Sequence, residues 1–227
     1  MDTLRQDIRY AIRRLIKSPA FTVVALLTLA LGIGANTAIF SVVNAVLLKP
    51  LPYQDPNHLV GIYHVSDGER AVVSGPNFYD VKKQSTTLQD AAAISTSRTI
   101  LTGQGEPVRL NAAEISASLF DLLGVQPALG RTFRGEENEP GKTSVAVLSH
   151  TLWQQRFGGD RNIVGRRITL DGVPFEVIGV MPERFSYPAD RAIWMPLEYT
   201  DNFTTKQRGA WYLSAVGRIR PAPPSSR

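Results

Sequence analysis

A stretch of 31 consecutive residues without a charged side chain, residues 18–48, constrains this chain more than any other feature. Ser18 followed by Pro19 is typical of a helix start, with an N-cap residue and then proline at the first helical position. A helix over residues 19–48 would be about 45 Å long, whereas the hydrocarbon core of a bilayer is about 30 Å thick. The sequence therefore predicts a transmembrane helix within residues 18–49 that tilts or projects beyond the bilayer.

A cleaved signal peptide is the alternative to a retained span. The basic region before the apolar stretch is long for a signal peptide, and the apolar residues continue past Gly34 into I-F-S-V-V without a convincing cleavage site. A buried helix of a soluble protein fits a stretch of this length less well. We therefore expect the span to be retained.

The charge distribution predicts the orientation of that span. Five basic residues precede it and Lys49 follows it, so the positive-inside rule places the N-terminus in the cytoplasm. Residues 50–227 hold 19 basic and 18 acidic side chains, so the overall charge of +5 is concentrated at the N-terminal end. A basic surface for nucleic acid is therefore not indicated, and no nucleic-acid partner is expected.

Residues 1–17 show a second helical pattern. Apolar residues recur at helical spacing at Leu4, Ile8, Ala11, Ile12, Leu15 and Ile16. Arg5, Arg9 and Arg13 fall on another face of the same helix. The pattern predicts an amphipathic helix on the cytoplasmic membrane surface, with its arginines near anionic headgroups. A protein partner could dock on the same helix, and the pattern does not choose between the two.

One face of the expected span is made of small and polar residues. At 100° per residue these fall within an arc of roughly 120°. They are Ala30, Gly34, Thr37, Ala38, Ser41, Asn44 and Ala45. Small residues allow another helix to approach closely, so we expect a helix-packing face here, although such residues are common in any span. Asn36 lies on the other side and is not explained by this face.

Prolines 50, 52 and 56 end the helix, and short strands and helices alternate irregularly after them. The expected strands are residues 59–65, 92–101, 108–115, 144–148 and 211–219, with a hairpin over 167–180 that turns at Asp171-Gly172. The expected helices are residues 75–84, 116–123 and 149–157. This irregular order predicts an α+β domain over residues 50–220, followed by a disordered tail at 221–227.

The segment G-E-E-N-E-P-G-K-T, residues 135–143, superficially resembles a phosphate-binding loop. Five residues separate its glycines where the P-loop has four, and Glu136, Glu137 and Glu139 would repel a triphosphate. The residues that follow predict a strand, whereas a P-loop is followed by a helix. We expect an exposed acidic turn and no bound nucleotide.

No other pattern predicts catalysis. The chain contains no cysteine, which excludes thiolate chemistry and cysteine metal sites. His58, His64 and His150 lack the spacing of metal ligands, and no serine lies in a G-x-S-x-G turn. Trp153, Trp194 and Trp211 are expected to be core or rim anchors. No enzymatic activity, cofactor or metal is expected.

Several blocks of the sequence resemble a known family. They include K-S-P-A-F-T-V-V-A from Lys17, L-A-L-G-I-G-A-N-T-A-I-F-S from Leu29, K-P-L-P-Y from Lys49 and F-D-L-L-G-V-Q-P-A-L-G-R-T-F from Phe120. Together they resemble ABC-transporter permeases of the FtsX/MacB type, in particular the acidobacterial duplicated orphan permease group. Residues 50–220 resemble the MacB-like periplasmic core domain of that family.

The resemblance implies the N-terminal portion of an export-type ABC transporter permease in the cell inner membrane, with a cytoplasmic N-terminus and residues 50–227 in the periplasm. It implies that the periplasmic domain transmits ATPase-driven motion to substrate handling outside the membrane. The implied partners are membrane lipid, further permease helices and a separate ABC ATPase subunit, and a homodimer is left open. Related chains continue into further spans, so the end of this chain suggests a truncated reading frame. The alternative function is a stand-alone membrane-anchored module that binds a periplasmic protein.

Overall fold

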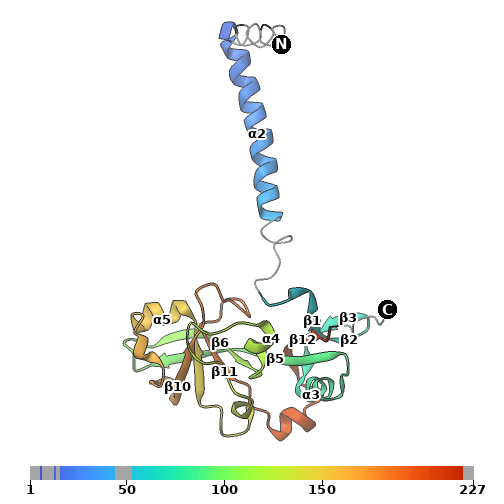
Figure 1. Ribbon diagram of the computed structural model, residues 1–227, viewed down its shortest axis with the longest axis vertical. Helices are drawn as coiled ribbons and strands as arrows, with labels where there is room; N and C mark the ends of the chain where they lie inside the picture. Colours follow the sequence, from blue (N-terminus) through green and yellow to red (C-terminus); the bar gives the residue numbers. More distant parts are fainter. Residues whose placement is uncertain (1–5, 7–12, 14–15, 44–52, 222–227) are drawn as a thin grey trace, which may run out of the picture. The chain divides into compact units, whose positions relative to one another are not determined.

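The computed structural model of the chain describes residues 6, 13, 16–43 and 53–221 (Figure 1). The chain divides into two compact units, Met1–Pro52 and Tyr53–Arg227, and each is described by itself. Most of the expected amphipathic helix over residues 1–17 and nearly all of the expected tail at 221–227 lie outside the described residues, so both stay predictions.

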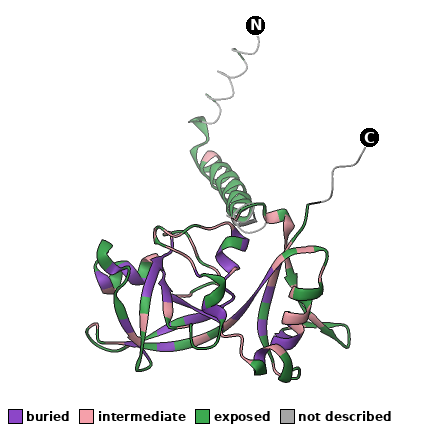
Figure 2. Ribbon diagram, turned by 60° about the horizontal axis from the view of Figure 1, so that its bottom comes forward, coloured by how far each residue is buried: buried purple, intermediate pink, exposed green. Residues whose placement is uncertain are grey.

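The first unit contains one long helix, α2, which covers Pro19–Val43 and begins at the proline that the sequence indicates. Its 25 residues correspond to about 37 Å of helix. Within Pro19–Ser41 an 18-residue stretch has a mean hydropathy of 2.0, and the helix is long and apolar enough to cross a membrane. The residues of α2 are almost all exposed (Figure 2), and they include large apolar side chains. Such a long apolar surface is unfavourable in water and favourable in the hydrocarbon of a membrane. The expected end of the helix at Leu48 lies outside the described residues.

The second unit is built on strands. In chain order these are β1 (Leu59–Ile62), β2 (His64–Ser66), β3 (Glu69–Ala71), β4 (Val73–Ser74), β5 (Leu88–Thr102), β6 (Val108–Ile115), β7 (Leu129–Gly130), β8 (Val145–Leu148), β9 (Arg167–Leu170), β10 (Val173–Val180), β11 (Ile193–Pro196) and β12 (Trp211–Ile219).

Ten of these strands form one mixed sheet. The order across it is β1-β12-β5-β6-β11-β8-β10-β7, with β4 beside β12 and β9 beside both β10 and β5. The pairs β6–β11 and β8–β10 are parallel, and the remaining pairs are antiparallel. Strands β2 and β3 form a separate hairpin. The mixed sheet with interspersed helices confirms the α+β fold class expected from the sequence.

Three α-helices and several shorter helical turns pack on this frame. They are α3 (Gly75–Gln84), α4 (Leu119–Leu123), α5 (His150–Phe157), η2 (Pro56–His58), η3 (Gly135–Asn138), η4 (Arg161–Ile163) and η5 (Asn202–Lys206). Helices α3 and α5 lie at opposite ends of the domain, with α4 between them (Figure 1). Ser149 caps α5 because its hydroxyl accepts a hydrogen bond from the Leu152 amide, and Gly158 ends the helix in a left-handed conformation.

The core is divided into three apolar clusters that correspond to the three helices. The cluster at α5 includes Leu152 and Phe157, the cluster at α4 includes Phe120 and Trp194, and the cluster at α3 includes Phe78. The Phe120 ring of α4 packs edge-on against Trp194 of β11, with centroids 6.0 Å apart, and the same cluster contains residues of β8 and β10. Of the three tryptophans, Trp153 and Trp194 are buried, whereas Trp211 is 45% exposed at the rim.

Three expected elements differ clearly from the structure at their limits. Strand β5 covers Leu88–Thr102, whereas the sequence predicted residues 92–101. The strand expected over residues 59–65 is interrupted at Tyr63, because β1 pairs with β12 whereas β2 pairs with β3. The helix expected over residues 116–123 begins only at Leu119. Ser116 follows directly after β6 and is still bonded to β5, since its amide donates to the Ala93 carbonyl and its hydroxyl accepts from the Ala93 amide.

The expectation of an exposed acidic turn at residues 135–143 is wrong for its centre. Glu137 is only 7% exposed and forms two hydrogen bonds with the Arg131 guanidinium, of 2.7 and 3.1 Å. Asn138 is 5% exposed, and its side chain bonds three main-chain groups. Glu136 and Glu139 are exposed as expected. The segment is followed by strand β8, which agrees with the rejection of a phosphate-binding loop.

Candidate functional site

The two ends of the second unit lie side by side. Strand β1, near its beginning, and strand β12, at its end, pair antiparallel, with Leu59 opposite Arg218 and Ile62 opposite Ala215. We call residues 53–58 the entering segment and residues 218–221 the leaving segment, and the place where they meet the junction. The fold therefore brings together two segments that are more than 150 residues apart in sequence.

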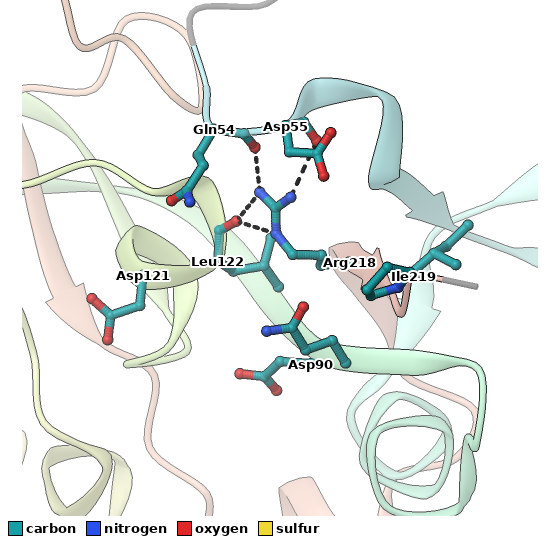
Figure 3. A pocket seen from close by; sticks show the side chains of 9 residues that line it. Gln54, Asp55, Asp90, Asp121, Leu122, Arg218 and Ile219 are labelled. Atoms are coloured by element: carbon teal, nitrogen blue, oxygen red, sulfur yellow. Dashed lines mark hydrogen bonds between the residues drawn. The ribbon is translucent and has the colours of Figure 1, made fainter. Parts of the chain in front are cut away.

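Arg218 lies at the centre of the junction (Figure 3). Its guanidinium donates to the carbonyl oxygens of Gln54 at 2.6 Å and Asp55 at 3.1 Å. It also donates twice to the Leu122 carbonyl near the end of α4, at 2.6 and 3.0 Å. Leu122 is in the last turn of α4, where carbonyl oxygens lack partners within the helix and favour a positive charge. One side chain thus connects β12, α4 and the entering segment.

Three further contacts hold the entering segment. The Gln54 amide donates to the Leu123 carbonyl at 3.1 Å. The Tyr53 ring packs edge-on against Tyr187 with centroids 5.9 Å apart, and burial raises the pKa of both phenols. Gly124 ends α4 with a φ of 69°, and a side chain there would collide with Gln54. Glycine is therefore required at this position for both its conformation and its size.

The leaving segment is bonded to the first residue of β5 and to the residue before it. The Arg220 amide donates to the Thr87 carbonyl at 3.0 Å, and its guanidinium donates to the Leu88 carbonyl at 3.0 Å. On the entering side, Asp55 has a φ of 47°, and its carboxylate lies 2.7 Å from Nδ1 of His58. Both segments are thus held by specific hydrogen bonds, and Arg218 of the leaving segment also takes part in the pairing of β1 with β12.

A cavity of about 310 Å³ opens at the junction. Its lining residues are Gln54, Asp55, Gln89, Asp90, Asp121, Leu122, Arg218, Ile219 and Pro221. Asp90 is paired with Lys82 at 2.8 Å, and the Asp121 carboxylate points away from Arg218 (Figure 3). Within the described part of the chain, no group of three or more His, Asp or Glu side chains is placed to hold a metal ion. The hydrogen bonds at the junction connect the entering segment, α4 and β12 through main-chain carbonyl oxygens.

A second cavity, of about 470 Å³, lies beside the start of α5. Its charged lining residues are of both signs, namely Glu183, Asp190 and Arg191. Arg191 is already engaged with the carbonyl oxygens of Ala189 and Ala112. This mixed lining does not select one class of ligand.

The described residues of the expected helix-packing face, Ala30, Gly34, Thr37, Ala38 and Ser41, are exposed on α2. The Thr37 hydroxyl donates to the Ile33 carbonyl at 2.7 Å, so it is satisfied within the helix. Asn44 and Ala45, the other two residues of that face, lie outside the described residues. The structure also has a shallow groove on a different side of α2, lined by Ala25, Thr28, Leu29, Gly32, Ile33 and Asn36. Neither side is tested by the structure, and the expected face stays a prediction.

Arg218 was not among the residues predicted from the sequence, although one signal was present. Arg218 is the only charged residue in β12, which lies between β1 and β5 in the sheet. A charged side chain within an interior strand requires partners, but the sequence does not show that those partners are carbonyl oxygens more than 90 residues away.

Comparison with known proteins gives a consistent result. A family model for the MacB-like periplasmic core domain matches residues 22–222. The Macrolide export ATP-binding/permease protein MacB of Bdellovibrio bacteriovorus is 28% identical over 156 residues, which are 69% of this chain and 24% of that protein. The chain therefore spans about a quarter of the length of this curated relative.

Two solved structures share the fold. The periplasmic region of MacB from Actinobacillus actinomycetemcomitans matches with a TM-score of 0.52 at 17% identity, over 74% of this chain and 76% of that one. The extracellular domain of the noncanonic ABC-type transporter YknZ from Gram-positive bacteria matches with a TM-score of 0.53 at 17% identity, over 72% and 84% of the two chains. At these identities the likeness concerns the fold.

Proposed function

The chain belongs to the family of MacB-like periplasmic core domains, and on this premise we propose that it is the first membrane span and the periplasmic domain of an export-type ABC transporter permease. The pairing of β1 with β12 is the observation that supports the proposal beyond family membership. A domain whose chain enters and leaves at neighbouring points can be inserted between two membrane helices without separating them. Movement of those helices would then reach the domain at one place, the junction.

In this proposal the chain is not an enzyme. A separate ABC ATPase subunit on the cytoplasmic face hydrolyses ATP, and the domain transmits the resulting motion to substrate handling outside the membrane. The packing of α4 supports this role, because α4 is hydrogen-bonded to Gln54 of the entering segment and to Arg218 of the leaving segment. Phe120 of α4 also packs against Trp194 of β11 in the core. A displacement at the junction would therefore be transmitted through α4 to the packed core of the domain.

We further propose that α2 spans the inner membrane with the N-terminus in the cytoplasm and residues 50–227 in the periplasm. The concentration of basic residues before the span supports this orientation. In this arrangement the acidic segment of residues 135–143 lies away from cytoplasmic ATP. Membrane lipid surrounds most of α2 in this proposal. Further permease helices pack on the face of Ala30, Gly34 and Ala38. A second copy of the chain is another candidate partner.

The coding DNA downstream of codon 227 tests the proposal against a stand-alone anchored module. A permease requires an open frame that encodes three further hydrophobic spans, and a separate ATPase that co-purifies with the product. A stop codon followed by an independent promoter would contradict the permease and favour a module that binds a periplasmic protein.

A further inference from the structure

Arg218 holds the entering and leaving segments through one guanidinium group. We propose that Arg218 is a positioning residue that locks these two segments and α4 into one rigid body, so that neither segment moves without the other. Its role in transmitting motion rests on the proposed function. The lock itself is a property of the domain and does not depend on transport.

The entering segment has few other main-chain ties to the rest of the domain. Strand pairing with β12 begins only at Leu59, so residues 53–58 lie outside the ladder. Three described hydrogen bonds connect the backbone of Gln54 and Asp55 to other parts of the domain. Two of them come from Arg218, and the third runs from the Gln54 amide to Leu123. Removal of the guanidinium therefore leaves the start of the domain tied mainly through one amide and the Tyr53 ring.

The arrangement depends on arginine and not only on positive charge. A guanidinium is planar and presents several N–H groups in a fixed fork, whereas the ammonium of lysine is a compact point charge. Four hydrogen bonds leave three different nitrogens of Arg218 toward three carbonyl oxygens. In the described part of the chain Arg218 has no ion pair with a carboxylate, so these carbonyl contacts account for its position.

The hydrogen bonds that hold the entering segment also include the last carbonyl groups of α4. The Leu122 carbonyl receives two of the four hydrogen bonds, and the next carbonyl, Leu123, is bonded to Gln54. Leu122 and Leu123 are themselves 5% and 2% exposed in the core. The entering segment is therefore fastened to a helix that is anchored in the interior, not to a surface loop.

Amide hydrogen exchange on the whole 227-residue chain in lipid nanodiscs tests the lock. We compare Arg218→Met, which keeps the aliphatic stem, with Arg218→Lys, which keeps the charge. Arg208→Met is the matched control, since Arg208 bonds Asn77 and Asp80 of α3, away from the entering segment. Exchange in residues 53–58 should accelerate on the order of tenfold in Arg218→Met and by less in Arg218→Lys. Strand β11 should be unchanged in both, and the Arg208 variant should leave residues 53–58 unchanged.

Two results would overturn the proposal. Unchanged exchange in residues 53–58 would show that Arg218 does not hold the segment. Equal acceleration in β11 would show that Arg218 supports the whole domain and has no specific role at the junction.

A second measurement uses the absence of native cysteine. Spin labels at Asn57→Cys and Gln84→Cys, both exposed positions, report the distance between the entering segment and α3. The distance distribution should be narrow in the parent chain and broader in the Arg218→Met background. Equal widths would contradict the lock. Because neither measurement requires an ATPase or a substrate, a failure of the proposed transport function would leave both results interpretable.

Discussion

Asn138 connects main-chain groups at the ends of two parallel strands. Its side chain accepts from the Ala117 amide at 2.7 Å and donates to the carbonyl oxygens of Leu197 at 2.7 Å and Ile115 at 3.3 Å. Asn138→Ala removes the printed partner of the Ala117 amide and of the Leu197 carbonyl, whereas the Ile115 carbonyl keeps its bond from the Leu197 amide. We therefore expect a loss of about 2–3 kcal/mol in the free energy of unfolding. For a chain of this length the melting temperature should fall by about 5–10 °C.

Thermal unfolding of the whole chain in detergent, followed by circular dichroism, measures this change. Glu136→Ala is the control, because Glu136 belongs to the same turn but is exposed. It should shift the melting temperature by little. Similar shifts for the two variants would mean that the hydrogen bonds of Asn138 do not stabilise the domain.

Burial of Glu114 should make the free energy of unfolding depend on pH. Burial raises the pKa of Glu114 above its ordinary value of 4.5, and the nearby charge of Glu198 raises it further. A raised pKa in the folded state means that the ionised carboxylate destabilises the domain at neutral pH. The penalty should grow as the pH rises from the ordinary value through the folded-state pKa, and it should be absent below that window.

The neutral variant Glu114→Gln should therefore melt at a higher temperature than the parent chain at about pH 7. The gain should disappear near about pH 4, where Glu114 is largely protonated in both states. Melting curves at the two pH values test this expectation. A gain of equal size at both pH values would point to packing of the amide and would refute the electrostatic explanation.

At the scale of elements, each of the two glycines of α2 lies on a different candidate packing face. Gly34 belongs to the face predicted from the sequence, and Gly32 lies in the groove on another side of the helix. A Cβ atom added at either position would have no neighbour within 4 Å apart from the backbone of its own helix and the adjoining residues. Leucine at either position therefore leaves the helix itself intact and changes only its contacts with other helices.

We expect Gly34→Leu to disrupt assembly of the full-length permease, because it blocks close approach of a neighbouring helix. Gly32→Leu is the matched control and should assemble normally. Blue native electrophoresis and co-purification of the ATPase measure the outcome. Loss of assembly with Gly32→Leu alone would assign the packing face to the groove, and the face predicted here would be wrong.

Elements with strong local signals could be predicted from the sequence. Helix α3 and strands β6 and β12 have the predicted limits, and the hairpin of β9 and β10 turns at Asp171-Gly172 as expected. Proline at a helix start, glycine after a helix end and alternation in a strand act within a few residues. Strand β11 was not predicted, because its four residues are all buried and therefore show no alternation.

The site was less predictable than the elements. The junction depends on contacts such as that between Arg218 and Gln54, which are 164 residues apart. The burial of Glu137 depends on Arg131, a much shorter-range contact that the acidic neighbours of Glu137 in the sequence did not suggest. Long-range hydrogen bonds have no local pattern, so they were found only in the structure. The resemblance to the FtsX/MacB type was available from sequence blocks, and the family match over residues 22–222 confirms it.

At the scale of the whole molecule, the two units require different surroundings. Helix α2 exposes apolar side chains along its described length, whereas the second unit has its own buried core and a nearly neutral charge. The proposed function requires α2 in lipid, the N-terminus in the cytoplasm and the second unit on the opposite side of the membrane. The side of the membrane on which each unit lies is therefore the central claim.

Single-cysteine labelling tests this claim most directly, because the chain has no native cysteine. Asp67→Cys lies in an exposed turn of the second unit, and Gln6→Cys lies at an exposed position before the span. A membrane-impermeant maleimide is added to cells of a Gram-negative host whose outer membrane has been permeabilised. We predict labelling of the Asp67→Cys variant in intact cells and of the Gln6→Cys variant only after lysis. Labelling of Gln6→Cys but not Asp67→Cys in intact cells, or recovery of both variants in the soluble fraction, would contradict the claim.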